Sequence, residues 1–307
     1  MTDAIVIEGL TKDYDGFKAV DSLSLRVKRD SLVGFLGPNG AGKSTTIKIL
    51  TNLIKATSGS AYLDGVDVTD DPKAALSNVG AVVETPEFYP YLTPNETLEY
   101  IGRLRGMSKG DIDSRSRDVL ELMRMSDVAD KRIGKFSKGM RQRVAIGQSL
   151  MSEPSIIILD EPTSGLDPRG MVEVREILKD LRNEDLTVFM SSHLLNEVED
   201  VCDTVSMMSQ GKLIHHSTVD ELRSMGGVRR LTVRTMRDMD AEDLEHIEGV
   251  VSVEVGSPTS MTVNFDGDDG MMNGLLRSVD ATSRVTSFCE TSNPIEAFYL
   301  SMIKESR

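Results

Sequence analysis

Near the start of the chain, apolar residues alternate with polar ones. The alternation runs over Ala4–Leu10 and returns at Leu23, Leu25 and Val27, which predicts a pair of antiparallel strands. Asp15-Gly16 lies between these two segments and is a turn signal. A second hairpin is predicted over residues 61–68, around Asp64-Gly65.

Farther along, apolar residues form short continuous runs instead. Each run is too short for a helix, so we expect buried strands, at Leu32–Leu36 and at residues 79–83, 156–159 and 187–190. Between the last two runs, helical spacing predicts an amphipathic helix through Val174, Ile177, Leu178 and Leu181. The strand–helix–strand alternation predicts a parallel α/β sheet with its ligand at the carboxyl ends of the strands.

Residues 86–135 have a different character. Pro86, Pro90 and Pro94 interrupt the first part of this segment. Helical spacing follows over residues 95–107 and 111–125, with Val119, Leu122 and Met123 on one face.

The main domain is predicted to end at Met225, before Gly226-Gly227, which gives domains of 1–225 and 226–307. The second domain is predicted to be a small α+β domain with the ferredoxin-like order βαββαβ. Its expected elements are strand 230–235, helix 241–248, strands 250–255 and 260–265, helix 270–279 and strand 284–290. A closing helix is expected over Pro294–Lys304.

Composition restricts the class of protein. The 307 residues carry a net charge of −14, which argues against nucleic acid as a partner, because nucleic-acid binding needs a basic face. No apolar stretch approaches the roughly 18–20 residues of a membrane helix, and the first residues lack a secretory signal, so we expect a cytoplasmic protein. Cys202 and Cys289 have no metal-ligand spacing, and Cys202 is expected to be buried among valines.

The segment Gly37–Ser44 reads Gly-Pro-Asn-Gly-Ala-Gly-Lys-Ser and fits the phosphate-loop pattern G-x-x-x-x-G-K-[ST]. Its glycines let backbone N–H groups approach phosphate oxygens, Lys43 would contact the β- and γ-phosphates, and Ser44 would bind Mg²⁺. The run 156–159 ends in two carboxylates, Asp160 and Glu161, so the two motifs together predict a site for a nucleoside triphosphate with magnesium. We expect the nucleotide to contact Gly37, Pro38, Asn39, Gly40, Ala41, Gly42, Lys43, Ser44 and Thr45.

Four further landmarks narrow the class. The strand that ends in Asp160 and Glu161 is preceded by the signature loop, as we call Phe136–Arg143, and is followed by Ser164-Gly165-Leu166-Asp167. The next predicted strand ends in Ser191-Ser192-His193. The fourth landmark is Tyr14, which lies before the phosphate loop. In this order they resemble the ATP-binding-cassette (ABC) ATPases across residues 4–225. The resemblance implies a phosphate-loop NTPase fold of parallel core sheet, antiparallel β subdomain and helical subdomain at about 86–135.

The resemblance also implies roles for single residues. Tyr14 would stack on the adenine ring of ATP, although a surface aromatic in a hairpin is the structural alternative. Asp160 would coordinate Mg²⁺, Glu161 would be the general base, and His193 would contact the γ-phosphate. Asp167 would touch a partner subunit.

Ser137 and Gly139 match the family's signature loop, which the resemblance places against the γ-phosphate bound to a second ATPase chain. A serine hydroxyl at a helix start supplies donors to developing negative charge. Since one chain holds one phosphate loop and one signature loop, the active form is expected to be a homodimer that closes on two ATP molecules.

Three positions depart from the usual family pattern. Lys138 and Met140 replace glycine and glutamine in the signature loop, and Glu84 stands where glutamine is common. Glutamate still offers oxygen to Mg²⁺, so the expected metal ligands are Ser44, Glu84 and Asp160. Glu84 is either a neutral replacement or alters coupling to the membrane partner.

The run Glu84–Thr93, with the signature loop, is similar to the stand-alone ATPases of antibiotic-, bacteriocin-immunity- and sodium-type exporters. This implies an ATPase that energises a separately encoded membrane permease at the cytoplasmic face of the membrane. The alternative is a non-transport ABC-type ATPase acting on a macromolecular partner, and import also stays open. A nucleotide sensor that does not hydrolyse is disfavoured, because Glu161 and His193 are both present.

Four residues of the same run, Phe88, Tyr89, Tyr91 and Leu92, form an apolar and aromatic cluster. They either seal the helical subdomain onto the core or anchor the permease, in which case Tyr89 or Tyr91 is exposed in the isolated chain.

Overall fold

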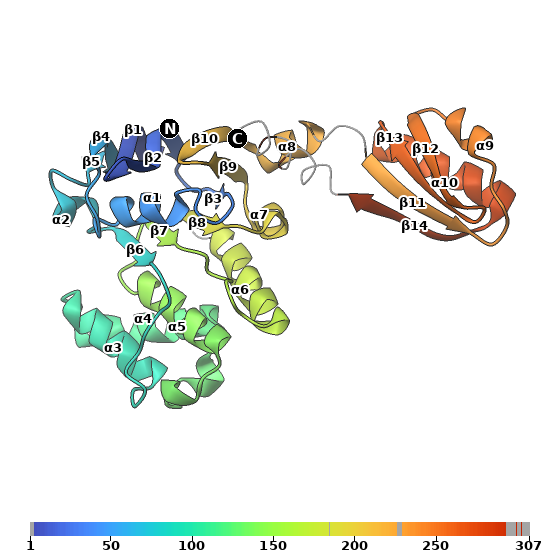
Figure 1. Ribbon diagram of the computed structural model, residues 1–307. Coiled ribbons are helices and arrows are strands. Elements are labelled where there is room, and N and C mark those ends of the chain that lie inside the picture. Colours follow the sequence, from blue (N-terminus) through green and yellow to red (C-terminus); the bar gives the residue numbers. More distant parts are fainter. Residues whose placement is uncertain (1–2, 184, 226–228, 293–298, 300–301, 303–307) are drawn as a thin grey trace. The chain divides into compact units, whose positions relative to one another are not determined.

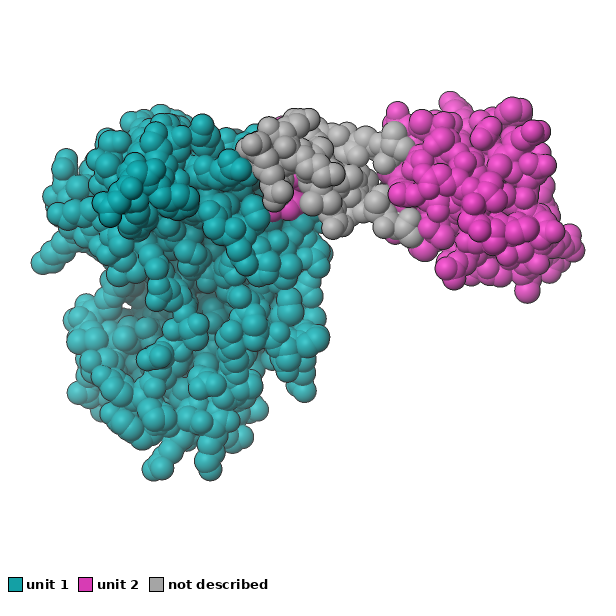
Figure 2. All heavy atoms as spheres, viewed as in Figure 1, with its two compact units in different colours: residues 1–219 teal, residues 220–307 magenta. Residues whose placement is uncertain are grey.

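The computed structural model describes residues 3–183, 185–225 and 229–292, with Tyr299 and Met302. The chain divides into two compact units, residues 1–219 (unit 1) and 220–307 (unit 2), which Figure 2 colours separately. The domain boundary expected from the sequence lies six residues later, at the end of helix α8 (Val219–Met225).

Unit 1 contains a six-stranded sheet in the order β10-β9-β3-β8-β7-β6 (Figure 1). β3 pairs in parallel with β8 and β9, and β7 pairs in parallel with β6 and β8, as the alternation of strands and helices predicted. β3, β7 and β8 are buried along their whole length, which explains their continuous apolar runs. The strands are β3 (Leu32–Leu36), β6 (Val79–Val82), β7 (Ile156–Leu159), β8 (Thr187–Ser192), β9 (Thr204–Ser209) and β10 (Lys212–Thr218).

A second, antiparallel sheet of unit 1 has the order β2-β1-β4-β5. At its first hairpin, Tyr14 pairs with Phe17 across the predicted turn, where Asp15 and Gly16 have φ angles of 51° and 94°. Positive φ at both central residues is what a tight two-residue hairpin requires. The strands are β1 (Asp3–Tyr14), β2 (Phe17–Lys28), β4 (Ser58–Leu63) and β5 (Val66–Asp67).

Three helices pack on one another: α3 and α4 come from the segment 86–135 that the sequence set apart, and α5 follows that segment and also contacts β6 (Figure 1). α3 starts earlier than predicted because Thr93 and Glu96 form a capping box with Pro94 in the first turn. It also stops earlier, because Gly106, with φ of 78°, ends it. These helices are α3 (Pro94–Leu104), α4 (Lys109–Leu122) and α5 (Lys138–Leu150), with short 3₁₀ turns at Ser126–Val128 and Ile133–Lys135.

The remaining helices of unit 1 flank the strands. The predicted stripe of α6 is confirmed, since Val174, Ile177, Leu178 and the following Leu181 are fully buried. Cys202, just after α7, is buried as predicted, and this burial raises the pKa of its thiol. These helices are α1 (Lys43–Leu50), α2 (Pro72–Ala75), α6 (Pro168–Asp180) and α7 (Leu195–Val201), with a 3₁₀ turn at Leu181–Asn183.

Unit 2 has the element order βαββαβ that the sequence predicted, with a four-stranded antiparallel sheet in the order β12-β13-β11-β14. Its own core includes Leu231, Val263, Phe265 and Leu275. The predicted closing helix at 294–304 lies outside the described residues, apart from Tyr299 and Met302. The elements are β11 (Arg229–Thr235), α9 (Ala241–Glu245), β12 (Val250–Ser257), β13 (Ser260–Phe265), α10 (Asp269–Ser283) and β14 (Val285–Ser292).

Candidate functional site

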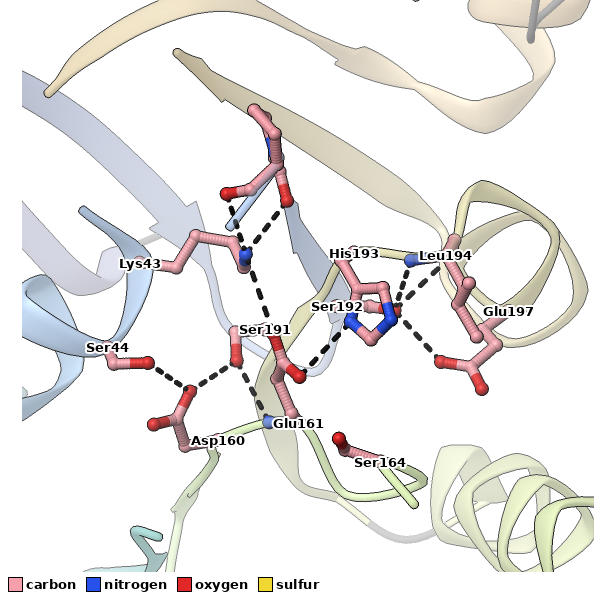
Figure 3. A network of polar contacts seen from close by, with 12 residues as sticks. Lys43, Ser44, Asp160, Glu161, Ser164, Ser191, Ser192, His193, Leu194 and Glu197 are labelled. Atoms are coloured by element: carbon pink, nitrogen blue, oxygen red, sulfur yellow. Dashed lines mark hydrogen bonds and ion pairs between the residues drawn. The ribbon is translucent and has the colours of Figure 1, made fainter. Parts of the chain in front are cut away.

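The sheet order of unit 1 gathers three of the sequence motifs at one edge. β3, β8 and β7 are adjacent, and their carboxyl ends lead into the phosphate loop, into His193 and into Asp160 and Glu161 respectively. Side chains that are far apart in the sequence therefore meet where parallel α/β sheets bind ligands. Figure 3 shows the resulting network of polar contacts.

The last two residues of the phosphate-loop motif, Lys43 and Ser44, are the first residues of α1, and Gly42 is its N-cap. Gly42 has φ of 107°, and a Cβ there would lie 2.2 Å from the carbonyl oxygen of Ala19. Only glycine fits this position, because the loop turns while packed against the neighbouring sheet. The N-terminus of α1 has no side-chain cap, so its first N–H groups stay available for an anion.

Lys43 lies over this loop. Its Nζ donates hydrogen bonds to the carbonyl oxygens of Gly37 at 2.8 Å and Pro38 at 3.2 Å, and lies 3.5 Å from Glu161 Oε1. The side chain is only 4% exposed, and this burial lowers the pKa of Lys43, while the charge of Glu161 opposes the shift. The ammonium is held by neutral carbonyls and one carboxylate, which an incoming phosphate can replace as partners.

Ser44 and Asp160 come together beside Lys43. Ser44 Oγ donates to Asp160 Oδ1 at 3.1 Å. The chemistry of these two oxygens fits Mg²⁺, which commonly takes one or two protein carboxylates and completes its shell with phosphate oxygens and water. Within the described ranges, no cluster of three or more His, Cys, Asp or Glu side chains occurs, so a metal here would depend on the nucleotide for further ligands.

The third expected metal ligand, Glu84, forms an ion pair with Lys48, whose Nζ lies 2.5 Å from Glu84 Oε1. Their hydrogen bond raises the pKa of Lys48 and lowers that of Glu84, whose side chain is 66% exposed. Sequence reasoning missed Lys48. The available signal was its spacing, because a residue four positions after Ser44 lies one turn along the same face of α1.

Glu161 and His193 meet in front of Lys43. His193 Nδ1 lies 3.1 Å from Glu161 Oε2, a distance that fits a hydrogen bond from an Nδ1–H to a carboxylate oxygen. Glu161 has φ of 45°, and its N–H donates to Ser191 Oγ at 2.9 Å. Ser191 Oγ in turn donates to Asp160 Oδ1 at 2.6 Å. One buried hydroxyl therefore fixes both carboxylate-bearing residues, a role that sequence reasoning did not assign.

The signature loop lies close to the segment after Glu161. Ser137 caps α5, with its Oγ accepting from the N–H of Met140 at 3.2 Å. Lys138 Nζ donates to the carbonyl oxygen of Ser164 at 2.7 Å. A Cβ on Gly139 would lie 3.3 Å from Gly170 Cα, so this glycine permits close approach of the two helix starts.

Two more predicted residues lie near helix and strand ends. Asp167 caps α6, with Oδ1 accepting from the N–H of Gly170 at 2.8 Å. Tyr14 is 47% exposed at the end of β1, and Lys12 Nζ lies 4.9 Å from the centre of its ring. The ring is thus at the surface, as a stacking platform requires.

Comparison of the sequence with known proteins gives matches to a single family. The family model described as ABC transporter matches residues 20–164. The chain is 38% identical to the bacitracin transport ATP-binding protein BcrA of Bacillus licheniformis, over 99% of this chain and 98% of that protein. It is 32% identical to the daunorubicin/doxorubicin resistance ATP-binding protein DrrA of Streptomyces peucetius, over 98% of this chain and 92% of that protein.

Solved structures extend the likeness to the fold. An ATP-binding subunit of an ABC transporter superposes with a TM-score of 0.64 at 28% identity, covering 72% of this chain and 92% of that chain. A dimeric ATP-binding cassette in a post-hydrolysis state, bound to ADP and phosphate, gives a TM-score of 0.63 at 27% identity, covering 70% of this chain and 98% of that chain.

Proposed function

Because this chain belongs to the ABC transporter ATP-binding proteins, a family of ATPases, we propose that it hydrolyses ATP to energise a separately encoded membrane permease that exports its substrate. The observation that carries the proposal is the cluster of Lys43, Ser44, Asp160, Glu161 and His193 at one sheet edge (Figure 3). None of the helices in the described part of the chain has the length and apolar character of a membrane span. Transport then needs a partner that crosses the membrane.

In the proposed reaction, the phosphate loop and Lys43 bind the β- and γ-phosphates of ATP. Ser44 and Asp160 would hold Mg²⁺, which neutralises phosphate charge when it is bound. Glu161 takes a proton from the attacking water as the water oxygen bonds to the γ-phosphorus and the bond to the ADP oxygen breaks. His193 donates a hydrogen bond from Nδ1 to Glu161, keeps its own proton, and so holds the carboxylate facing the phosphate loop.

Each catalytic site is proposed to be shared between two chains. Ser137 Oγ accepts a hydrogen bond from Met140 and still has its own proton to donate to a phosphate oxygen. The N-terminus of α5 adds its positive dipole end. The dimeric cassette with bound ADP and phosphate, to which this chain is similar, supports a dimer as the working form.

An export role is supported by the relatives, since one serves bacitracin transport and another drug resistance, as their names state. We propose that this chain likewise works with a permease of the exporter type, on the cytoplasmic face of the membrane. The substrate itself would be selected by the permease.

Two surfaces of unit 1 suit that partner. Tyr89 and Tyr91 are 56% and 62% exposed, and their rings stack with centres 5.7 Å apart. A groove of about 1140 Å³ has apolar residues such as Leu76, Val79 and Met151 in its lining, together with charged residues such as Arg105. The exposed aromatic pair favours a protein partner rather than open solvent, and the groove offers such a partner both apolar and charged contacts.

Replacement of Glu161 by glutamine tests the proposed reaction. Glu161→Gln keeps the shape of the side chain but removes the base, so phosphate release should fall by at least ~10²-fold while ATP still binds. The measurement is steady-state phosphate release beside equilibrium ATP binding. Glu176→Gln, at a half-exposed position of α6 that pairs with Lys179, is the matched control and should hydrolyse ATP normally. A Glu161→Gln enzyme that turns over near the wild-type rate would remove Glu161 from this role.

A further inference from the structure

A second buried carboxylate lies behind His193. Glu197 is on α7, one turn after the histidine, and only 2% exposed. Its Oε2 accepts a hydrogen bond from Ser192 Oγ at 2.9 Å (Figure 3). Within the described part of the chain its Oε1 is buried and has no hydrogen-bond partner.

Burying the Glu197 carboxylate lowers the stability of the fold. A buried carboxylate oxygen without a partner loses its hydration and gains nothing in return. Its neighbours along α7 include Leu195, Val198 and Val201, which are buried and apolar. Packing alone therefore does not explain the glutamate, and its contact with Ser192 is the feature that a leucine would lack.

Ser192 links Glu197 to the backbone on both sides of His193. Ser192 immediately precedes the histidine, and its Oγ accepts the N–H of Leu194, which immediately follows it, at 3.0 Å. A hydroxyl has one proton, and of its two acceptors Glu197 Oε2 at 2.9 Å is nearer than the carbonyl oxygen of Leu194 at 3.3 Å. Donating the proton to Glu197 orients the oxygen lone pairs toward that N–H. The three residues 192–194 are thus closed into a small turn whose orientation is fixed by α7.

This turn determines where the imidazole points. His193 reaches Glu161 with Nδ1 at 3.1 Å, while Ser191, on the strand before it, holds the N–H of Glu161 and the carboxylate of Asp160. The two serines at the end of β8 therefore have different hydrogen-bond partners: Ser191 bonds to Asp160 and Glu161, and Ser192 bonds to Glu197.

We propose that Glu197 is a positioning residue for ATP hydrolysis, which acts through Ser192 to hold His193 against Glu161. The inference rests on the proposed ATPase function. Glu197 itself touches neither the nucleotide site nor the reacting atoms. Its carboxylate sets the rotamer of the Ser192 hydroxyl, and the hydroxyl sets the backbone that carries the imidazole.

Substitutions of Glu197 in the full-length chain test this role. Glu197→Leu removes the acceptor and frees the turn, so kcat should fall about 10- to 100-fold, the range expected when a catalytic group is misplaced by about 1 Å. The KM for ATP should change little, because the phosphate loop is untouched. Glu197→Gln keeps an oxygen acceptor for Ser192 and should retain most of the activity. Asn196→Leu, an exposed position of the same helix, is the matched control.

The double variant Ser192→Ala/Glu197→Leu separates positioning from folding. Replacing both partners removes the Ser192 hydroxyl and the Glu197 carboxylate together, and only the N–H of Leu194 loses an acceptor, so most of the thermal stability lost in Glu197→Leu should return. Under the positioning role kcat stays low, because nothing orients the turn. Recovery of kcat together with stability would overturn the proposal and leave Glu197 a purely structural residue.

The outcomes distinguish this inference from the proposed function. If wild-type chain hydrolyses ATP and Glu161→Gln does not, but folded Glu197→Leu has the wild-type kcat, only the role of Glu197 is refuted. If Glu197→Leu does not fold, Ser192→Ala decides in its place: a reduced kcat with unchanged KM supports the proposal, and an unchanged kcat contradicts it. If wild-type chain shows no hydrolysis, the proposed function itself fails and the inference fails with it.

Discussion

Buried polar side chains have different kinds of hydrogen-bond partners in the two units of this chain. In unit 1, Lys43, Ser191, Ser192 and Glu197 are almost completely buried, and they bond across elements at one sheet edge. In unit 2, the buried hydroxyls of Thr235 and Ser283 donate to backbone carbonyls, of Arg237 and Asp238, and to no charged side chain among the described residues. The charged residues of unit 2, such as Arg229 with Glu290, form pairs that reach the surface.

The difference follows from how the sheets are built. Parallel strands such as β3, β7 and β8 all end at one edge, so their following loops bring polar residues together there. Antiparallel neighbours such as β12 and β13 end at opposite edges, so no single edge collects them. Burying polar groups costs free energy unless they are fully bonded, so a cluster like that of unit 1 supports the proposal that this sheet edge binds a ligand.

The largest effect on the rate of ATP hydrolysis is expected when the two halves of a shared site are inactivated in different chains. Ser137→Ala and Lys43→Ala should each abolish most hydrolysis, because one removes the donor from the signature loop and the other the cation of the phosphate loop. Mixing equal amounts should restore up to roughly a quarter of the wild-type rate, since half of the dimers are mixed and each holds one intact site.

The controls for this mixing experiment are either variant alone at the same total concentration. Ser137 also caps α5, so Ser137→Ala costs about 1 kcal/mol of stability, and thermal unfolding must show that the variant is folded. Full-rate hydrolysis by a strictly monomeric preparation would contradict the shared site.

A more selective effect is expected at the aromatic pair. Tyr91→Ala should leave the ATPase rate of the purified chain close to wild type, because Tyr91 is exposed and stacks only at the surface on Tyr89. Co-purification with the membrane permease should be lost, since aromatic residues dominate interface hot spots. Tyr100→Ala, another exposed tyrosine on α3, is the matched control and should keep the permease bound. Joint loss of solubility and ATPase activity would instead make Tyr91 a structural residue.

The sequence predicted features that depend on local pattern. The apolar run of β7, the stripe of α6 and the phosphate loop were all recognisable because their physical requirements recur within a few residues. Helix ends were predicted less well, since Thr93 and Gly106 set the limits of α3 through capping geometry rather than hydrophobic spacing.

Contacts between elements that are distant in the sequence could not be predicted from the sequence pattern. The pairing of Glu84 with Lys48 joins the end of β6 to α1, and the contact of Ser191 with Asp160 joins β8 to the end of β7. The hydrogen bond between Ser192 and Glu197 joins residues that are close in sequence, but it forms only because of the way α7 follows β8. Residue types at these positions were visible, and their partners were not.

The contrast between the two units is tested most directly by removing one of them. We expect a chain of residues 1–225 to bind MgATP with the same dissociation constant as the full-length chain, measured by calorimetric titration. Unit 2 contains none of the nucleotide motifs, so its loss should leave the sheet edge of unit 1 intact. Circular dichroism and thermal unfolding must show that the shortened chain is folded. Equal affinity would support the assignment of nucleotide binding to unit 1 alone, and a folded 1–225 chain that has lost its affinity for MgATP would contradict it.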